Sequence, residues 1–169
     1  MSAAQKLVVR PLTRAGFARF GDVIEIEGAR SFPINDGSCI RFNDLAKIDV
    51  TTQDGRAAIS VFRGQPVSFP VHLAEVERHP LGSQAFMPMG EIPFLIVVAA
   101  DAGGGKPGEP FAFLSNGCQG VNYAKGVWHH PLLSLDKVSD FLVVDRAGHG
   151  ENCDVAALPG RYLIESITV

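Results

Sequence analysis

Apolar and polar residues alternate in short runs along most of the chain, and Gly, Pro and Asp separate the runs. Alternation with a period of two predicts β-strands that bury one face, because successive side chains of a strand point to opposite sides. The turn residues between the runs mark where each strand ends. The predicted strands cover residues 7–10, 22–26, 58–63, 67–73, 84–87, 94–100, 111–114, 128–135, 141–145 and 162–169.

Only one early segment has a helical pattern. Thr13 can cap the first turn, Phe17 and Phe20 fall on one face, and Gly21 can end the helix. Further along, residues 101–110 contain three consecutive Gly followed by two Pro, which predicts a flexible surface loop.

Many short strands and little helix predict a mainly β fold, because a half-apolar sheet must bury its inner face on another sheet. A chain of 169 residues without an evident linker fits one domain over residues 1–169. We therefore expect a single β-sandwich or β-barrel with a short N-terminal helix.

Charge and cysteine content narrow the class of partner. The net charge is −3 and no long basic run occurs, so neither nucleic acid nor an anionic membrane is an expected partner. The longest apolar run, residues 92–100, is too short to span a bilayer, and residues 1–6 lack the features of a secretory signal. The cysteines, Cys39, Cys118 and Cys153, are odd in number and widely spaced, which argues against a disulfide framework. We expect a cytoplasmic protein that handles a small molecule.

Two adjacent histidines, His129 and His130, follow Gly126 in a short apolar segment. Imidazoles suit acid–base chemistry near neutral pH and also bind metals. In a regular strand only one of the two can point into a barrel. The residues alone leave open which one does.

A second polar cluster lies at Glu75, Glu77 and His79, which share one face if the segment is extended. They could line a polar pocket, although an exposed edge strand with outward charges has the same pattern.

Further candidates lie elsewhere in the chain. A guanidinium matches a carboxylate in bidentate fashion, so Arg41 or Arg63 could anchor an acidic substrate, and a surface ion pair is the alternative for each. Asn122 follows two glycines in a predicted hairpin whose side chains approach a cavity mouth. Asp145 ends a buried strand and could orient a histidine.

Taken together, these clusters resemble the ureidoglycolate lyase family of allantoin degradation, in purine catabolism. The segments that carry the resemblance are residues 20–24, 34–37, 77–86, 120–123, 127–132, 140–142 and 152–154. The resemblance implies a cupin-like (RmlC-like) double-stranded β-barrel, a homodimer, and a carbon–nitrogen lyase that cleaves (S)-ureidoglycolate into glyoxylate and urea. It also implies a dependence on, or stimulation by, Ni²⁺.

Compared with the broader cupin pattern, residues 126–129 fit the Gly-x-x-His end of the second motif and favour His129 as the inward residue. The first motif is reduced to His79, with Leu81 and Gln84 where its second His and its Glu would fall. His79, Gln84 and His129 make a weak candidate metal site, because stable sites use three good donors. The absent ligands favour acid–base chemistry.

Cleavage of a carbinolamine needs a base at the hydroxyl, an acid at the departing nitrogen and a cation for the carboxylate. Under the resemblance, the predicted catalytic residues are His79, His129 and His130, and Asp145 is predicted to support a histidine. The predicted substrate-binding residues are Arg41, Arg63, Gln84, Asn122 and Tyr123.

Two other functions fit a small barrel. A metal-dependent cupin isomerase or dioxygenase is disfavoured by Leu81 and Gln84. A non-catalytic barrel that binds a small acid as a sensor would be indicated by an attached DNA-binding segment, which the sequence does not show.

Overall fold

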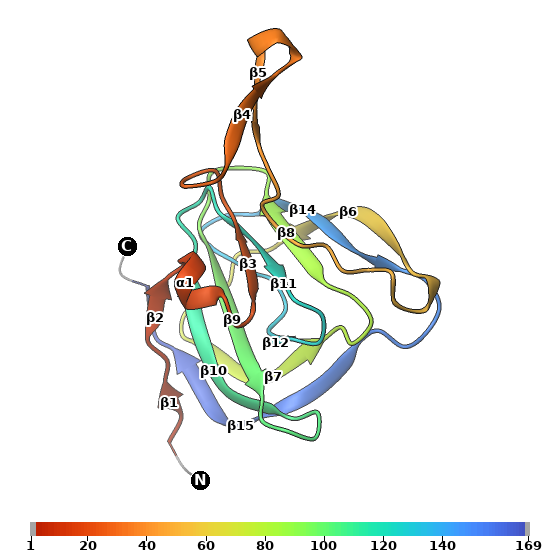
Figure 1. Cartoon of the computed structure of the whole chain (residues 1–169). Helices are drawn as coiled ribbons and strands as arrows, with labels where there is room; N and C mark the ends of the chain where they lie inside the picture. The colour runs from red at the N-terminus through yellow and green to blue at the C-terminus, as the bar shows by residue number, and fades with distance from the viewer. Residues whose placement is uncertain (1–2, 168–169) are drawn as a thin grey trace.

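The computed structural model describes residues 3–167 and consists mainly of strands arranged in two large sheets and one projecting hairpin (Figure 1). The mainly β prediction is confirmed. The first sheet has the order β1 (Gln5–Lys6), β15 (Asp154–Ile164), β7 (Val71–Arg78), β12 (Trp128–His129), β9 (Phe94–Asp101), β10 (Pro107–Leu114) and β2 (Val9–Pro11), with β13 (Leu133–Ser134) beside β9. The second has the order β3 (Gly21–Ile24), β11 (Gly120–Tyr123), β8 (Gln84–Pro88), β14 (Ser139–Ala147) and β6 (Arg56–Gly64).

The hairpin is formed by β4 (Ser31–Ile34) and β5 (Cys39–Phe42), joined through the short 3₁₀ turn η1 (Asn35–Gly37). It extends away from the two large sheets at the top of Figure 1. A second 3₁₀ turn, η2 (Thr52–Asp54), precedes β6. Among residues 3–167, no helix has the length and apolar character needed to cross a membrane.

The predicted helix is present as α1 (Arg14–Phe17). Thr13 caps it as expected, because its Oγ1 accepts a hydrogen bond from the Gly16 amide at 3.1 Å. Phe17 is fully buried and Phe20 nearly so, which places the aromatic face of this segment in the core.

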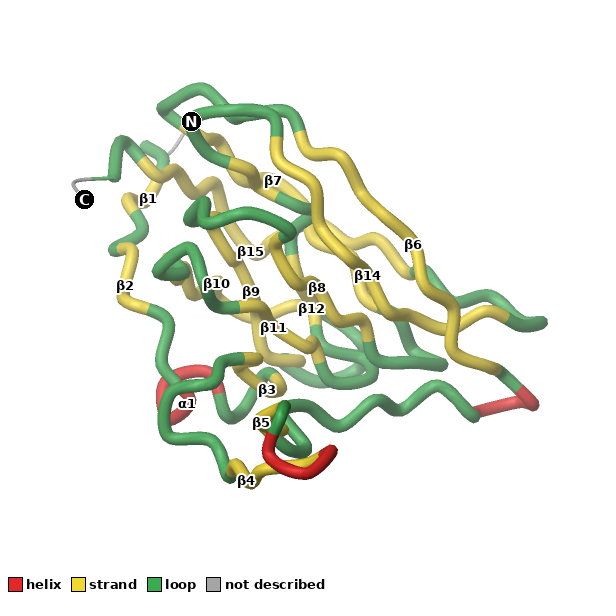
Figure 2. Tube along the Cα trace, turned by 90° about the horizontal axis from the view of Figure 1, so that it is seen from above, coloured by secondary structure: helices red, strands yellow, loops and turns green. Residues whose placement is uncertain are grey.

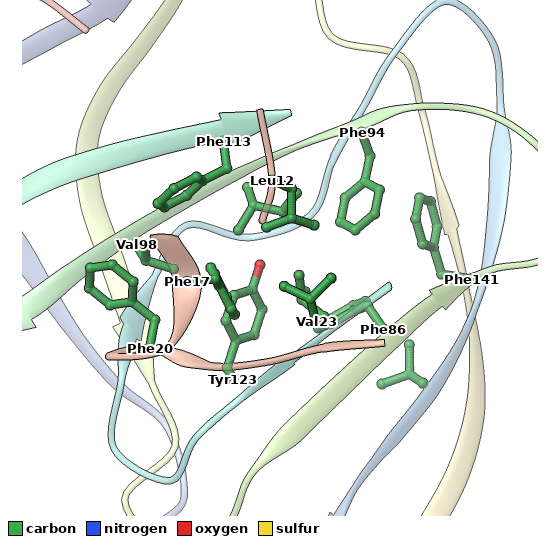
Figure 3. Close-up of a cluster of buried hydrophobic side chains, with 13 residues drawn as sticks. Leu12, Phe17, Phe20, Val23, Phe86, Phe94, Val98, Phe113, Tyr123 and Phe141 are labelled. Atoms are coloured by element: carbon green, nitrogen blue, oxygen red, sulfur yellow. The ribbon is translucent and has the colours of Figure 1, made fainter. Parts of the chain in front are cut away.

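The main core lies between the two large sheets and takes side chains from both (Figure 3). Strand β9 explains why residues 94–100 read as an uninterrupted apolar run. Phe94, Ile96 and Val98 enter this core, whereas the alternate side chains enter a second cluster around Trp128. A strand buried on both faces has no polar side to alternate with.

Several predicted boundaries are wrong, each for a local reason. The loop at 101–110 is shorter, because β9 continues to Asp101 and β10 begins at Pro107, where an irregular register accommodates the prolines. The strand at 128–135 is split into β12 and β13, because Pro131 has no N–H to donate to a ladder. The strand at 67–73 begins only at Val71, after Pro70.

The predicted last strand, 162–169, is instead the longer β15, which ends at Ile164; residues 168–169 lie outside the described part of the chain. Leu158, Pro159 and Gly160 lie within β15 at a shift in its register with β7, and they hide the strand from a search for alternation. Of the predicted strand 7–10, only Val9 and Arg10 lie in a strand, β2, and β1 ends before it at Lys6. The predicted strands also do not include β4, β5 or β11.

Candidate active site

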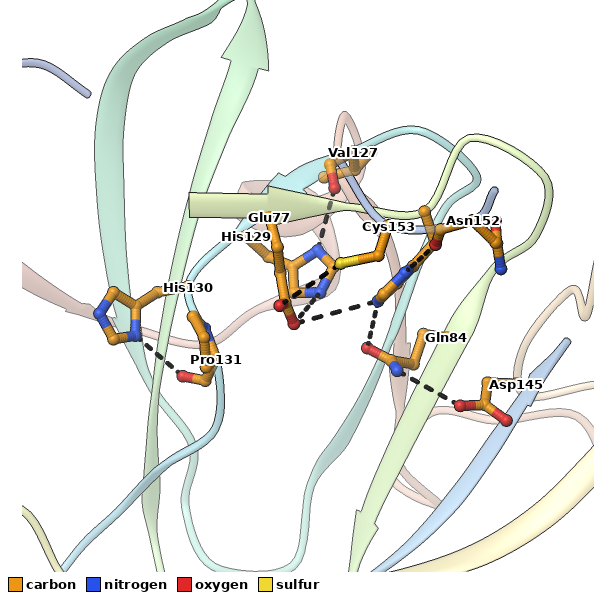
Figure 4. A network of polar contacts seen from close by, with 10 residues as sticks. Glu77, Gln84, Val127, His129, His130, Pro131, Asp145, Asn152 and Cys153 are labelled. Atoms are coloured by element: carbon orange, nitrogen blue, oxygen red, sulfur yellow. Dashed lines mark hydrogen bonds and ion pairs between the residues drawn. The ribbon is translucent and has the colours of Figure 1, made fainter. Parts of the chain in front are cut away.

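Adjacent strands bring Glu77, His79 and His129 together inside the barrel. Figure 4 shows Glu77 beside His129. Glu77 on β7 pairs directly with His129 on β12, and His79 follows the end of β7. Glu77 Oε1 lies 3.6 Å from His129 Nε2 and 4.0 Å from His79 Nε2. The imidazole rings are 5.2 Å apart. We call Glu77, His79 and His129 the triad.

His129 is the inward residue of the histidine pair, as strand alternation and the cupin comparison predict, and is only 2% exposed. Its Nδ1 lies 3.0 Å from the Val127 carbonyl oxygen, which fixes the tautomer with hydrogen on Nδ1. The pKa of His129 is lowered to about 3, mainly by burial; the Val127 hydrogen bond opposes the shift, and His79 and His130 add to it. The ring is therefore neutral at pH 7. Within residues 3–167, its Nε2 lone pair is buried without a hydrogen-bond donor.

The ring of Tyr123 lies against one face of the His129 ring. The two rings stack with centroids 4.2 Å apart and planes 10° apart. Burial, followed by the charge of Glu77, raises the pKa of Tyr123 well above its ordinary value. The tyrosine is therefore neutral, and its stacked ring holds the imidazole in place.

His79 is held by a backbone carbonyl and by Gln84. Its Nδ1 donates to the Asn152 carbonyl oxygen at 2.6 Å, and its Nε2 lies 3.2 Å from Gln84 Oε1. The Gln84 amide donates its NH₂ to Asp145 Oδ2 at 3.4 Å. Because a carboxylate only accepts, Asp145 orients the amide so that its oxygen faces His79.

This orientation determines what His79 Nε2 can carry. A bare Nε2 lone pair facing the Gln84 oxygen would set two acceptors against each other. Either a proton on Nε2 or a cation shared by the two atoms removes that conflict. The site is therefore built for a positive charge between His79, Gln84 and Glu77.

The triad has the donor set of a metal site. One ligand atom from each of its residues lies within 4.8 Å of the other two. Both imidazoles donate Nδ1–H to a backbone carbonyl, which is how metal-binding histidines are usually oriented. The sequence offered the amide of Gln84 as the third donor, whereas the structure adds the carboxylate of Glu77.

The other predicted residues are distributed around the molecule. His130 lies apart from the triad, with its Nδ1 2.9 Å from the Pro131 carbonyl oxygen (Figure 4). Glu75 is exposed on β7. Asn122 lies on the face of β11 opposite Tyr123, and its amide donates to Asp22 Oδ2 and the Lys47 carbonyl, both at 2.9 Å. The structure therefore does not bring Asn122 to the triad.

Neither predicted arginine lies near the triad of its own chain. Arg63 makes a bidentate ion pair with Asp140, at 2.7 and 2.8 Å, on the surface. Arg41 lies on the projecting hairpin.

The sequence did not identify Asn152 and Cys153 as neighbours of His79 and Glu77. Asn152 supplies the carbonyl that binds His79, and its side-chain oxygen accepts from the Leu81 amide at 2.7 Å. Cys153 Sγ lies 4.0 Å from Glu77 Oε2, and burial raises the pKa of this thiol. No spacing signal links these residues to His79, because they are more than seventy positions away.

Comparison with known proteins gives consistent matches. The family model described as ureidoglycolate lyase matches residues 4–165. The chain is 56% identical over 153 residues to the ureidoglycolate lyase of Burkholderia mallei (strain NCTC 10229), which spans 90% of this chain and 89% of that protein. It is 54% identical over 165 residues to the ureidoglycolate lyase of Burkholderia cepacia, spanning 98% and 93%.

Among solved structures, the chain is similar to dTDP-6-deoxy-D-glucose-3,5-epimerase RmlC from Legionella pneumophila Philadelphia 1. The TM-score is 0.46 and the identity 15%, over 78% of this chain and 69% of that chain.

Proposed function

The chain belongs to the ureidoglycolate lyase family, and from that premise we propose that it cleaves (S)-ureidoglycolate into glyoxylate and urea, as a step of allantoin and purine catabolism. The observation that carries the proposal is the triad, in which a carboxylate and two oriented imidazoles meet inside the barrel. This arrangement provides both a proton acceptor and a site for a cation.

The reaction breaks one bond and moves one proton. The carbon atom of the bond that breaks carries a hydroxyl, a carboxylate and a ureido nitrogen. When the hydroxyl loses its proton, its oxygen forms the aldehyde of glyoxylate and the carbon–nitrogen bond breaks. The departing nitrogen gains a proton and leaves as urea. No water is consumed, so the enzyme needs only to accept a proton and return it.

The residues fit a divalent metal ion, and Ni²⁺ is the ion we propose. His129 Nε2 is a buried lone pair without a donor, and Glu77 Oε1 and His79 Nε2 are directed at the same space. Imidazole nitrogen and carboxylate oxygen are ligands that suit Ni²⁺. Glu77, His79 and His129 would hold the ion, with Gln84 Oε1 beside it, and the bound ion would supply a Lewis acid that polarises the substrate's oxygen atoms.

Oε2 of Glu77 is the atom we assign to proton transfer, because Oε1 is the carboxylate oxygen directed at the ion site. The side chain of Glu77 is 26% exposed, so it can meet a substrate that enters from solvent, whereas His129 is almost fully buried. A carboxylate can take the hydroxyl proton and pass it to the departing nitrogen while the substrate remains bound. Gln84, fixed by Asp145, presents a polar group for the urea end. Tyr123 keeps His129 in position.

Two further properties are proposed with the function. Free thiols at all three cysteines are compatible with a reducing compartment, which supports a cytoplasmic location. A homodimer is proposed on the strength of the family resemblance.

Product analysis tests the function. The purified protein is incubated with racemic ureidoglycolate, and glyoxylate, urea and ammonia are measured. We expect glyoxylate and urea in equal amounts and consumption of one enantiomer. Ammonia in place of urea would indicate a hydrolase, and the absence of any turnover with Ni²⁺ supplied would contradict the proposal.

A further inference from the structure

The β4–β5 hairpin lacks the packing that a hairpin normally needs. Its two strands pair only with each other, and among the described residues its closest packing is against its own η1 turn. Two-stranded hairpins are marginal alone in water. Ile40 is nevertheless 56% exposed and Phe42 37% exposed. Exposed apolar side chains on a projecting element indicate a surface that another molecule covers.

A second uncovered surface lies along β6. This strand is at the edge of its sheet, beyond β14, as Figure 2 shows from above. Ile59 is 73% exposed and Val61 56% exposed on its outer face. Phe62 points to the inner side, where it packs on Phe86, yet it is 40% exposed. A long, apolar, unpaired edge is a surface that proteins usually cover or pair.

The inner side of β6 borders the triad. Ala58 pairs with Asp145 on β14, and Asp145 binds the Gln84 amide that faces His79. A segment lying along the exposed inner side of β6 would therefore come close to His79.

The triad lacks a cation of its own chain for an anionic substrate. Within residues 3–167, the ion-pair contacts of Glu77 are with the two imidazoles only. Arg78 of β7 and Arg146 of β14 are already engaged, Arg78 with Asp101 and Asp154 and Arg146 with backbone carbonyls. A guanidinium from outside the chain would complete the site.

We infer that the β4–β5 hairpin of a second copy of this chain docks along β6 and presents its Arg41 to the substrate's carboxylate in the site of its neighbour. The inference rests on the proposed function. Ile40 and Phe42 lie on one face of the hairpin, and Arg41 lies on the other. Ile40 and Phe42 can therefore pack on the inner side of β6, where Phe62 is 40% exposed, while Arg41 on the opposite face of the hairpin is directed across the barrel toward the triad.

A second copy is the occupant because both uncovered surfaces belong to the same chain. Around a two-fold axis, each hairpin covers the β6 of the other subunit, so one symmetric contact buries both surfaces. A guanidinium also fits a carboxylate through two parallel hydrogen bonds, which an α-hydroxy acid substrate offers.

The test combines two variants that are each expected to be impaired as homodimers, and activity is measured at a substrate concentration below KM. Arg41→Gln and Glu77→Gln chains carrying different tags are co-expressed, and the mixed dimer is purified by both tags. If Arg41 acts across the interface, one of the two sites contains both intact residues, and the mixed dimer has about half of the wild-type activity. If Arg41 acts within its own chain, both sites of the mixed dimer are impaired and it is no more active than either homodimer, which overturns the inference. If Arg41 does not act, the Arg41→Gln homodimer keeps the full wild-type activity, which overturns it as well.

Kinetics of the Arg41→Gln homodimer provide a second readout. Loss of a charge-assisted contact to the carboxylate raises KM for ureidoglycolate roughly 10- to 100-fold. The matched control is Arg161→Gln, which removes an exposed arginine of β15 and leaves KM unchanged.

The oligomeric state separates this inference from the proposed function. By sedimentation equilibrium we expect a wild-type dimer, and a monomer when Ile40 and Phe42 are both replaced by Ser. A monomeric wild type, or an unchanged dimer in the double variant, overturns the inference. If the wild-type protein has no lyase activity, the proposed function fails, and hairpin docking is then decided by sedimentation alone.

Discussion

At the scale of single residues, the orientation of two imidazoles determines what the site can do. Backbone carbonyls of Val127 and Asn152 hold the Nδ1 hydrogens of His129 and His79. The Nε2 atoms therefore face Glu77, and one of them is a buried lone pair without a donor. Leaving a buried polar atom without a partner costs about 1–3 kcal/mol. A bound cation removes that cost.

The Gln84 amide depends on Asp145 for its orientation, which gives a first prediction. Asp145→Asn removes the obligatory acceptor, so the Gln84 amide can turn and present NH₂ to His79. We expect Ni²⁺ affinity, measured by calorimetric titration, to fall roughly 10- to 100-fold, as for other residues that orient metal ligands. Asp140→Asn is the matched control on the same strand, because Asp140 pairs with Arg63 at the surface. Equal affinities for the two variants would show that Asp145 does not orient the site.

Part of the site was predictable from single residues. Strand alternation and the Gly-x-x-His match selected His129 over His130, and His79 was named as its partner. Glu77 was noted beside His79, but its role was not, because its pairing with His129 is a contact between strands fifty positions apart. Asn122 was predicted as a binding residue, but it lies on the face of β11 turned away from the triad, where its amide binds Asp22 and the Lys47 carbonyl.

At the scale of elements, the segment of residues 47–55 is hydrogen-bonded to the strands around the site. Residues 47–55, which we call the strap, bond to Ser83 through Asp49 and to Asn122 through Lys47. Arg146 of β14 is only 8% exposed and donates to the carbonyl oxygens of Thr52, Gln53 and His149 at 2.8 to 3.2 Å. It thus ties the strap and the turn after β14 to the barrel.

Replacing Arg146 tests how much its hydrogen bonds to the strap stabilise the fold. Arg146→Met preserves much of the side chain's length and leaves three carbonyls without a donor. We expect the free energy of unfolding, from urea denaturation, to fall by about 2–4 kcal/mol. Arg56→Met, at an exposed position of the neighbouring β6, should change it by less than about 0.5 kcal/mol. A loss below 1 kcal/mol for Arg146→Met would mean that the strap is held by its other contacts.

Elements were predictable where alternation, a cap or a long apolar run marks them. The helix follows from its cap at Thr13, whereas strand β9 follows from its long apolar run and not from alternation. Hairpin β4–β5 has exposed side chains on both faces, so no buried stripe reveals it. Strand β11 is buried on both faces and contains only four residues, so it has no polar alternation. Prolines in β10 and β15 were interpreted as breaks, although irregular registers accommodate them.

At the scale of the whole molecule, the triad connects β7 and β12 of one sheet, and Gln84 and Asp145 extend the network into the other sheet. An ion held at the triad beside Gln84 would therefore stabilise contacts between the two sheets. Because a ligand that binds only the folded state stabilises it, the transition temperature reports on occupancy.

Thermal unfolding tests this linkage. Ni²⁺ at 100 times its dissociation constant adds about 2.7 kcal/mol of stability. For a chain of this size, that corresponds to a rise in Tm of about 5–10 °C. Mg²⁺, which prefers oxygen ligands, serves as the control ion and should leave Tm nearly unchanged. An equal shift with both ions would place the binding outside the triad.

The central claim is that Glu77, with the two imidazoles, forms the centre that cleaves ureidoglycolate. The most direct test is kcat/KM for glyoxylate release by Glu77→Gln, compared with Glu75→Gln at an exposed position of the same strand. Glu77→Gln keeps the shape of the side chain and removes its charge and basicity, so we predict a loss of roughly 100- to 10,000-fold, with Glu75→Gln near the wild-type value. A folded Glu77→Gln enzyme that retains the wild-type kcat/KM would contradict the account.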